Sequence, residues 1–318
     1  MNSDVFRLIA VRVAVALGTL LIVSGIVFTA TNLLPGDVAE AILGQSASPE
    51  AVAGVRRALN LDRPAPVRYV EWLFNLLTGD LGQSLVNRLP VAHLLASRLP
   101  NSLLLAGIAA SICVPVALLL GITTAVWRGT LYDRAISTFT ITTVSVPEFL
   151  VATLAVLVFA VTLRWLPAMS YATNVESIGQ LFRSFSLPVA TLSCVVMAQM
   201  TRMTRAALLT VLSSSYVEMA VLKGARPARI VLLHALPNAI GPIANAIAFN
   251  LSYLVGGAII VEIIFSYPGI ARLMVDAVAT RDLPLIQACA MIFSAAYLML
   301  VLLADICAIV SNPRLRYR

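Results

Sequence analysis

Long stretches without a charged residue constrain this chain more than any other feature. Four such runs, each of 22 residues or more, occupy positions 13–36, 99–127, 230–261 and 283–304. A helix that rises about 1.5 Å per residue needs about 20 apolar residues to cross the hydrocarbon core of a bilayer. Each run is therefore long enough to span a membrane once.

Two further stretches complete the count of spanning helices. Residues 135–163 are interrupted only by Glu148, and residues 186–209 only by Arg202 and Arg205. The sequence therefore predicts an all-α polytopic membrane protein with six transmembrane helices. A soluble helical protein is excluded, because 60% of the residues are hydrophobic and only 12% are charged, too few to form a polar shell.

The N-terminal run resembles a signal peptide in having Arg7 and Arg12 before an apolar stretch. The stretch from Val13 to Leu34 is too long for the apolar part of a signal, and no small-residue cleavage site closes it. We therefore expect residues 1–34 to be a retained first transmembrane helix.

The distribution of Lys and Arg predicts the orientation. With the N-terminus inside, the inner segments hold twelve cations and three acids, and the outer segments hold ten cations and nine acids. Cytoplasmic loops carry the excess of Lys and Arg. We therefore predict that both termini lie inside, and the asymmetry explains the pI of about 9.6 without a nucleic-acid partner.

The predicted organisation follows from the same pattern. Residues 35–98 form an outer insert with short interfacial helices, and residues 99–310 form a core of five helices. A cytoplasmic loop at 210–240 interrupts this core, and residues 311–318 are a cytoplasmic tail. The four cysteines have no C-x-x-C spacing, so we predict buried thiols, no disulfide and no metal site.

The inner loop reads YVEMAVLKGARPARIVLLHALPNAIGP from Tyr216. Gly224 permits a turn, and Pro227 suits the first turn of a following helix. The loop is thus predicted to be a basic helix–turn–helix, continuous with spanning helices at both ends. An ordinary inner loop would have the same charge.

The spacing of the loop distinguishes these interpretations. The loop resembles the EAA signature of permeases in ATP-driven, binding-protein-dependent importers. The matching positions are Glu218-Met219-Ala220, Gly224 after three further residues, His234 after nine further residues, and Leu236-Pro237 after one further residue. Met219 and His234 depart from that signature. Further similar segments are LLPGD at 33–37, GDLGQSL at 79–85, RGTLYDRAIS at 128–137, SVPEFLVA at 145–152 and GGAIIVEIIFSYPGIARLMVDAV at 256–278.

The resemblance is to the first permease of the dipeptide/oligopeptide/nickel class of ABC importers, and it implies the type I importer fold. It also implies that the loop docks on a cytoplasmic ATPase through Tyr216, Glu218, Ala220, Lys223, Gly224, Arg226, His234 and Pro237. In this interpretation Ala220 permits close approach, Glu218 meets a basic residue, and Lys223 and Arg226 meet acidic ones.

The implied partners are a second related permease, two ATPases and an external solute-binding protein, in a bacterial inner membrane. A pair of identical permeases is the alternative. ATP and Mg would be bound by the ATPases, because no phosphate-binding G-x-x-x-x-G-K-[ST] loop occurs in the chain and we expect it to bind no cofactor. We expect di- or oligopeptides as cargo, with nickel, glutathione, sugars or opines as alternatives.

Three acids at membrane depth, Glu148, Glu262 and Asp305, are costly in lipid and are candidates for function. Glu148 could contact a cationic group in the translocation pathway, or hydrogen-bond a neighbouring helix. For Glu262, Asp305 and His234 we expect structural roles.

Two other classes of function were weighed. A proton-coupled secondary transporter would be expected to show paired repeats, and none is visible. An intramembrane protease would need a Ser/His pair or H-E-x-x-H, but His93 and His234 are predicted on opposite sides of the membrane. The chain is therefore predicted to be a non-catalytic subunit.

Overall fold

The computed structural model describes residues 3–33, 48–58, 62–170, 178–226 and 229–310. The predicted tail 311–318 and Pro227 lie outside these residues, as do parts of the predicted outer loops. Within the described residues the structure is helical, with a single isolated bridge between Gln83 and Pro90 and no strand.

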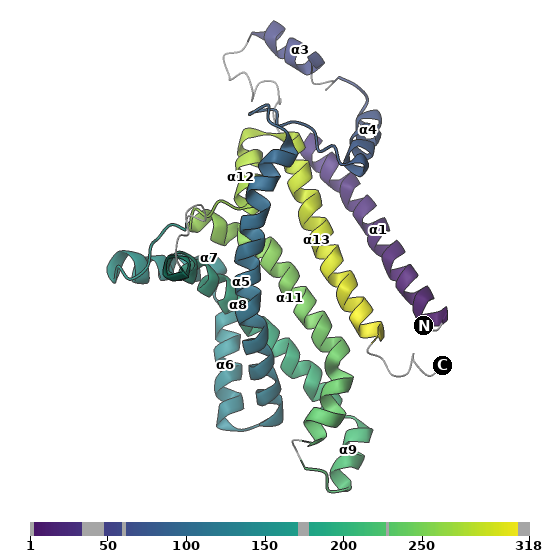
Figure 1. Cartoon of the computed structure of the whole chain (residues 1–318), viewed down its shortest axis with the longest axis vertical. Helices are drawn as coiled ribbons and strands as arrows, with labels where there is room; N and C mark the ends of the chain where they lie inside the picture. Colours follow the sequence, from purple (N-terminus) through teal and green to yellow (C-terminus); the bar gives the residue numbers. More distant parts are fainter. Residues whose placement is uncertain (1–2, 34–47, 59–61, 171–177, 227–228, 311–318) are drawn as a thin grey trace. The chain divides into compact units, whose positions relative to one another are not determined.

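The helices follow one another as shown in Figure 1. In chain order they are α1 (Ser3–Asn32), α3 (Pro49–Ala58), α4 (Ala65–Thr78), α5 (Val91–Val126), α6 (Leu131–Ser145), α7 (Glu148–Ala155), the π-helix η1 (Val156–Thr162), α8 (Ile178–Leu212), α9 (Ser215–Leu222), the π-helix η2 (Ile230–Ala235), α11 (Leu236–Ile264), α12 (Ile270–Thr280) and α13 (Leu283–Val310).

Five helical segments of the described chain are long and apolar enough to cross a membrane, and a bent pair can supply a sixth span. The five lie in α1, α5, α8, η2 with α11, and α13. The sixth span was predicted as one helix over 135–163. The structure divides it into α6 and α7–η1, which meet at 95°. Val146 precedes Pro147 and is extended (φ −88°, ψ 126°), because a residue before proline is kept out of the helical region.

One compact unit of the chain comprises residues 1–16, 103–267 and 296–318. Its core contains α5, α7, α8 and α11, with Leu105, Leu192, Leu254 and Phe265 among the fully buried side chains. Gly121 of α5 faces Thr204 of α8 so closely that an added Cβ would lie 2.7 Å from the Thr204 Cβ. Small residues permit this kind of close helix packing in membranes.

The second unit comprises residues 17–102 and 268–295. Its core includes Val91, Ile270 and Cys289. The amphipathic helix α4 packs its Tyr69 and Trp72 rings against Phe28 of α1, while Phe74 and Leu77 are 65% and 78% exposed. The Ser84 hydroxyl donates to the Asp282 carboxylate, which also accepts from the Leu85 amide at 3.0 Å.

All four cysteines have free thiols. Cys113 and Cys289 are buried, as predicted. Cys307 is exposed, so the prediction of a buried thiol is wrong there. It lies in the apolar helix α13, where lipid is available to cover an exposed apolar face.

Candidate coupling site

The short helix α9 is formed by local backbone signals. Ser214 is extended (φ −81°, ψ 149°), and its carbonyl accepts from the amide of Glu218 at 3.1 Å. At the other end Gly224 has φ +74°, and two hydrogen bonds close the helix: Gly224 N–H to Val221 O and Ala225 N–H to Ala220 O. This pair of bonds is a Schellman motif, in which the left-handed residue is usually glycine. Gly224 therefore has the turn-forming role expected from the sequence.

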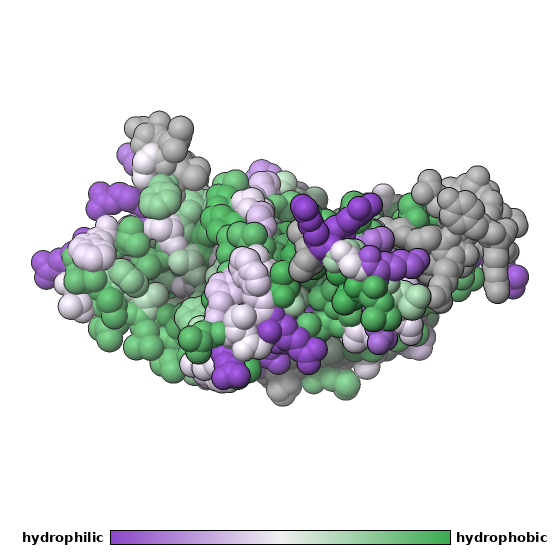
Figure 2. Space-filling model, turned by 90° about the horizontal axis from the view of Figure 1, so that it is seen from below, coloured by the Kyte–Doolittle hydropathy of each residue, from purple (hydrophilic) through white to green (hydrophobic). Residues whose placement is uncertain are grey.

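Most of α9 is exposed. Val217 is the buried residue of this helix, whereas Tyr216, Met219 and Leu222 are 46%, 54% and 75% exposed. Glu218, Lys223 and Arg226 are also exposed, and Ala220 is half-buried. Seen from the end where α9 lies, the surface has hydrophilic side chains among apolar ones (Figure 2). This helix thus presents an apolar surface with charged residues of both signs beside it.

The π-helix η2, the next described helix after α9, packs against two of the spanning helices. Ile230, Val231 and Ala235 of η2 are buried, and Val231 and Ala235 pack in one cluster with Ala125 of α5 and Leu208 of α8. α9 itself contacts both η2 and α8. Both α9 and η2 therefore lie against α8, and η2 also packs on α5.

The sequence analysis missed the π-helical turn of η2. The amide of Leu236 donates to Val231 O, five residues back, and the next residue is Pro237, which has no amide to donate. Asn238 Nδ2 donates to the His234 carbonyl at 2.8 Å. The half-buried His234 thus lies in the wide turn that leads into α11. In the sequence, Pro237 was the signal from which this π-helical turn could have been predicted.

Comparison with known proteins places this arrangement in a family. Residues 117–317 match the family described as "Binding-protein-dependent transport system inner membrane component", and residues 5–106 match its N-terminal companion family. The chain belongs to this family. It is therefore a multi-pass inner-membrane permease subunit of an ABC importer, non-catalytic in itself, in a system that includes a binding protein.

Relatives match the permease along nearly its whole length. A protein of Sinorhizobium fredii (strain NBRC 101917 / NGR234), named a probable peptide ABC transporter permease, is 36% identical over 96% of this chain and 98% of its own. The glutathione transport system permease GsiC of Salmonella choleraesuis (strain SC-B67) is 37% identical over 94% of this chain and 95% of its own.

Glu148 is the first residue of α7 in the permease and is buried. Its Oε2 accepts a hydrogen bond from the Tyr253 hydroxyl of α11 at 2.9 Å. Its Oε1 is buried and has no hydrogen-bond partner among the described residues. The bond joins the helix after the break to α11, and the second oxygen remains available for a donor.

The other two acids at membrane depth are in different surroundings. Glu262 is fully buried near the end of α11. Burial of the Tyr267 phenol, and after it the negative charge of Glu262, raise the pKa of Tyr267. Asp305 pairs with Arg12 of α1, with Oδ2 and Nη1 3.2 Å apart. Described residues include no cluster of three metal-ligating side chains.

A buried ion pair that was not predicted joins α6 to α8. Arg205 of α8 donates to both carboxylate oxygens of Asp133 on α6, at 2.8 and 3.0 Å. Asp133 also accepts from the Gly129 amide at 2.9 Å, and Thr130 caps the start of α6. Both residues were predicted on the inner side of the membrane. They are 72 positions apart in the sequence, so their pairing became visible only from the packing of α6 on α8.

Proposed function

We propose that this permease couples ATP hydrolysis by cytoplasmic ATPase subunits to the import of di- or oligopeptides. Its α9 would be the element that docks on the ATPase. The ATPases would bind ATP and Mg, and a second, related permease would complete the pathway. An external binding protein would deliver the peptide. Both termini would then lie in the cytoplasm, as the positions of Lys and Arg indicate.

The observation that carries the docking proposal is the exposed apolar face of α9, a helix that contacts both η2 and α8. Exposed apolar side chains on the spanning helices have lipid to cover them. Tyr216, Met219 and Leu222 are on a short helix in a segment predicted to lie outside the bilayer, so a protein partner would have to cover them. Lys223 and Arg226 beside this face, with Glu218, would set the orientation of the partner by charge.

Movement of this dock would reach the membrane through the buried contacts of η2 with α5 and α8. Closure of two ATPases around ATP would displace α9 as a rigid body. The spanning helices would then change between inward- and outward-open arrangements. Glu148, with one oxygen lacking a donor, is the proposed contact for a cationic group of the peptide within the pathway.

Peptide cargo is supported by a relative that matches this chain almost end to end and carries a peptide transporter name. A match named for glutathione transport is also in keeping with a peptide-like cargo. Nickel, sugar and opine transport have no comparable support from these relatives.

A matched pair of substitutions tests the docking proposal. Met219→Asp places a carboxylate on the exposed face of α9, and Leu131→Asp makes a similar change on α6, at a side chain that is 84% exposed. With the permease co-expressed with its transporter partners, we expect Met219→Asp to reduce ATPase recovery at least about tenfold, since a central apolar contact is worth about 2 kcal/mol. Leu131→Asp should leave recovery near the wild-type value. Equal recovery with both variants would contradict the docking role of α9.

A further inference from the structure

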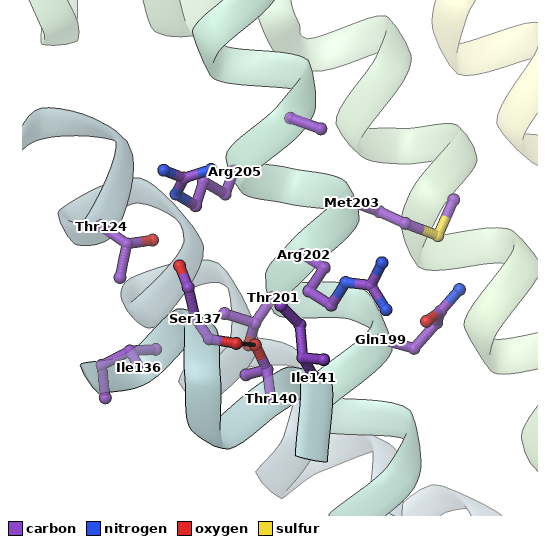
Figure 3. A pocket seen from close by; sticks show the side chains of 11 residues that line it. Thr124, Ile136, Ser137, Thr140, Ile141, Gln199, Thr201, Arg202, Met203 and Arg205 are labelled. Carbon is purple, nitrogen blue, oxygen red and sulfur yellow. Dashed lines mark hydrogen bonds between the residues drawn. The ribbon is translucent and has the colours of Figure 1, made fainter. Parts of the chain in front are cut away.

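A cavity of about 360 Å³ lies between α5, α6 and α8 of the permease (Figure 3). Ser137 and Thr140 line it from α6, and Gln199 and Arg202 line it from α8. The two members of each pair are three positions apart in the sequence, so they lie on one face of their helix. Two polar helix faces thus meet around one cavity in an otherwise apolar bundle.

Arg202 gives this cavity a net positive charge. The neighbouring Arg205 is neutralised by its two hydrogen bonds to Asp133. Arg202 is exposed and has no ion-pair partner in the part of the chain that the structure describes. A guanidinium group can only donate hydrogen bonds. The cavity therefore favours a ligand that presents a negatively charged acceptor.

Gln199 favours a ligand that presents a hydrogen-bond donor. Its Oε1 is buried and has no hydrogen-bond partner among the described residues. An amide oxygen can only accept, so the ligand must also present a donor. The Ser137 hydroxyl already donates to Asp133 Oδ1 and the Thr140 hydroxyl to Ser137 O, so both have lone pairs left for the cavity. A buried acceptor without a donor is destabilising, and a ligand that donates to Gln199 Oε1 would remove this cost.

We propose that this cavity binds the carboxyl end of a peptide in transit through the permease. The terminal carboxylate would accept from Arg202, and a peptide N–H would donate to Gln199 Oε1. Ile136, Ile141 and Met203 form apolar parts of the lining, and a flexible Met side chain adapts to varied residues. The volume falls within the range of small-ligand sites. This inference rests on the proposed peptide cargo and adds a substrate site within the membrane subunit itself.

Two forms of one peptide test the inference directly. The transporter complex, without its binding protein, is placed in phosphatidylcholine nanodiscs and titrated with trialanine or trialanine amide by ligand-observed NMR. Trialanine serves because the argument concerns the ends of a peptide and not its side chains. We expect the wild type to bind the acid at least about tenfold more tightly than the amide, the usual strength of a charge-assisted hydrogen bond.

Arg202→Gln should abolish this preference, because it removes the charge that recognises the carboxylate. The matched control Arg134→Gln changes the same residue type on an exposed part of α6 and should retain the preference. Gln199→Leu should weaken binding of the acid and the amide alike. If Arg202→Gln does not assemble, Arg202→Lys should keep a reduced preference for the acid.

Equal affinity of the wild type for the acid and the amide would overturn the inference, as would an unchanged preference in Arg202→Gln. A phosphatidylethanolamine headgroup also carries an anion and a donor. Displacement of trialanine when this lipid is added to the nanodiscs would therefore overturn the peptide assignment. Failure of the proposed function would appear separately, as a wild-type complex without ATP-dependent peptide uptake, and the binding comparison does not depend on uptake.

Discussion

At the scale of single residues, the packing of α5 on α8 depends on the absence of a side chain at Gly121. A Cβ there would lie 2.7 Å from the Thr204 Cβ and 2.9 Å from the Thr201 carbonyl oxygen. Backbone atoms cannot rotate away as the end of a side chain can. The two helices would have to move apart to admit even one methyl group.

Gly121→Ala is therefore expected to destabilise the permease by about 1–3 kcal/mol, the usual cost of overpacking a core. Gly107→Ala is the matched control, because Gly107 lies in the same helix and an added Cβ would meet nothing within 4 Å. Thermal unfolding midpoints in one detergent compare the two. An equal midpoint for Gly121→Ala and Gly107→Ala would contradict the close contact between α5 and α8.

At the scale of elements, the Asp133–Arg205 pair attaches the first turn of α6 to α8. The Asp133 side chain is 6% exposed and that of Arg205 is 28% exposed. Removal of one member leaves a buried charge without its partner, which costs more than removal of both.

A double-mutant cycle measures this attachment. We expect Asp133→Ala and Arg205→Ala each to lower stability by about 3–5 kcal/mol, and the double variant to lose clearly less than the sum of the two. Chemical unfolding of the purified permease gives the three values. Additive losses would show that the two side chains act independently.

Most of the elements could be predicted from the sequence, because an apolar run of about 20 residues leaves few alternatives in a membrane. The ends of the helices could not. α5 begins at Val91 and α8 begins at Ile178. Each start lies eight residues before the apolar stretch from which the helix was predicted. Helices continue beyond the hydrocarbon, where Arg98 and Arg183 have access to water, so the absence of charge marks only part of each helix. The 95° bend after Ser145 divides a span that was predicted as one helix over 135–163.

The candidate site was predicted only in part. Gly224 was identified through its spacing, and the structure shows the left-handed turn that it permits. The anchoring of η2, the Asp133–Arg205 pair and the cavity at Arg202 were missed. Each joins residues from different helices, so no local pattern contains them. Arg202 and Arg205 looked alike in sequence, and only packing neutralises one and leaves the other facing a cavity.

At the scale of the whole molecule, the account makes α9 the point where the permease meets its ATPase. Two independent observations support this contact: the chain belongs to the importer family, and α9 has an exposed apolar face. The predicted topology places α9 in the cytoplasm and α12, which lies between the fifth and sixth predicted spans, outside. The permease should therefore contact the ATPase through α9 and not through α12.

Site-directed photocrosslinking in intact cells tests this claim most directly. A photoreactive residue replaces Met219 or Leu222, which are 54% and 75% exposed on α9, or Val278, which is 42% exposed on α12. The account predicts crosslinks to the ATPase subunit from positions 219 and 222 and none from position 278. Crosslinks from position 278, or their absence at both α9 positions in an assembled transporter, would contradict it.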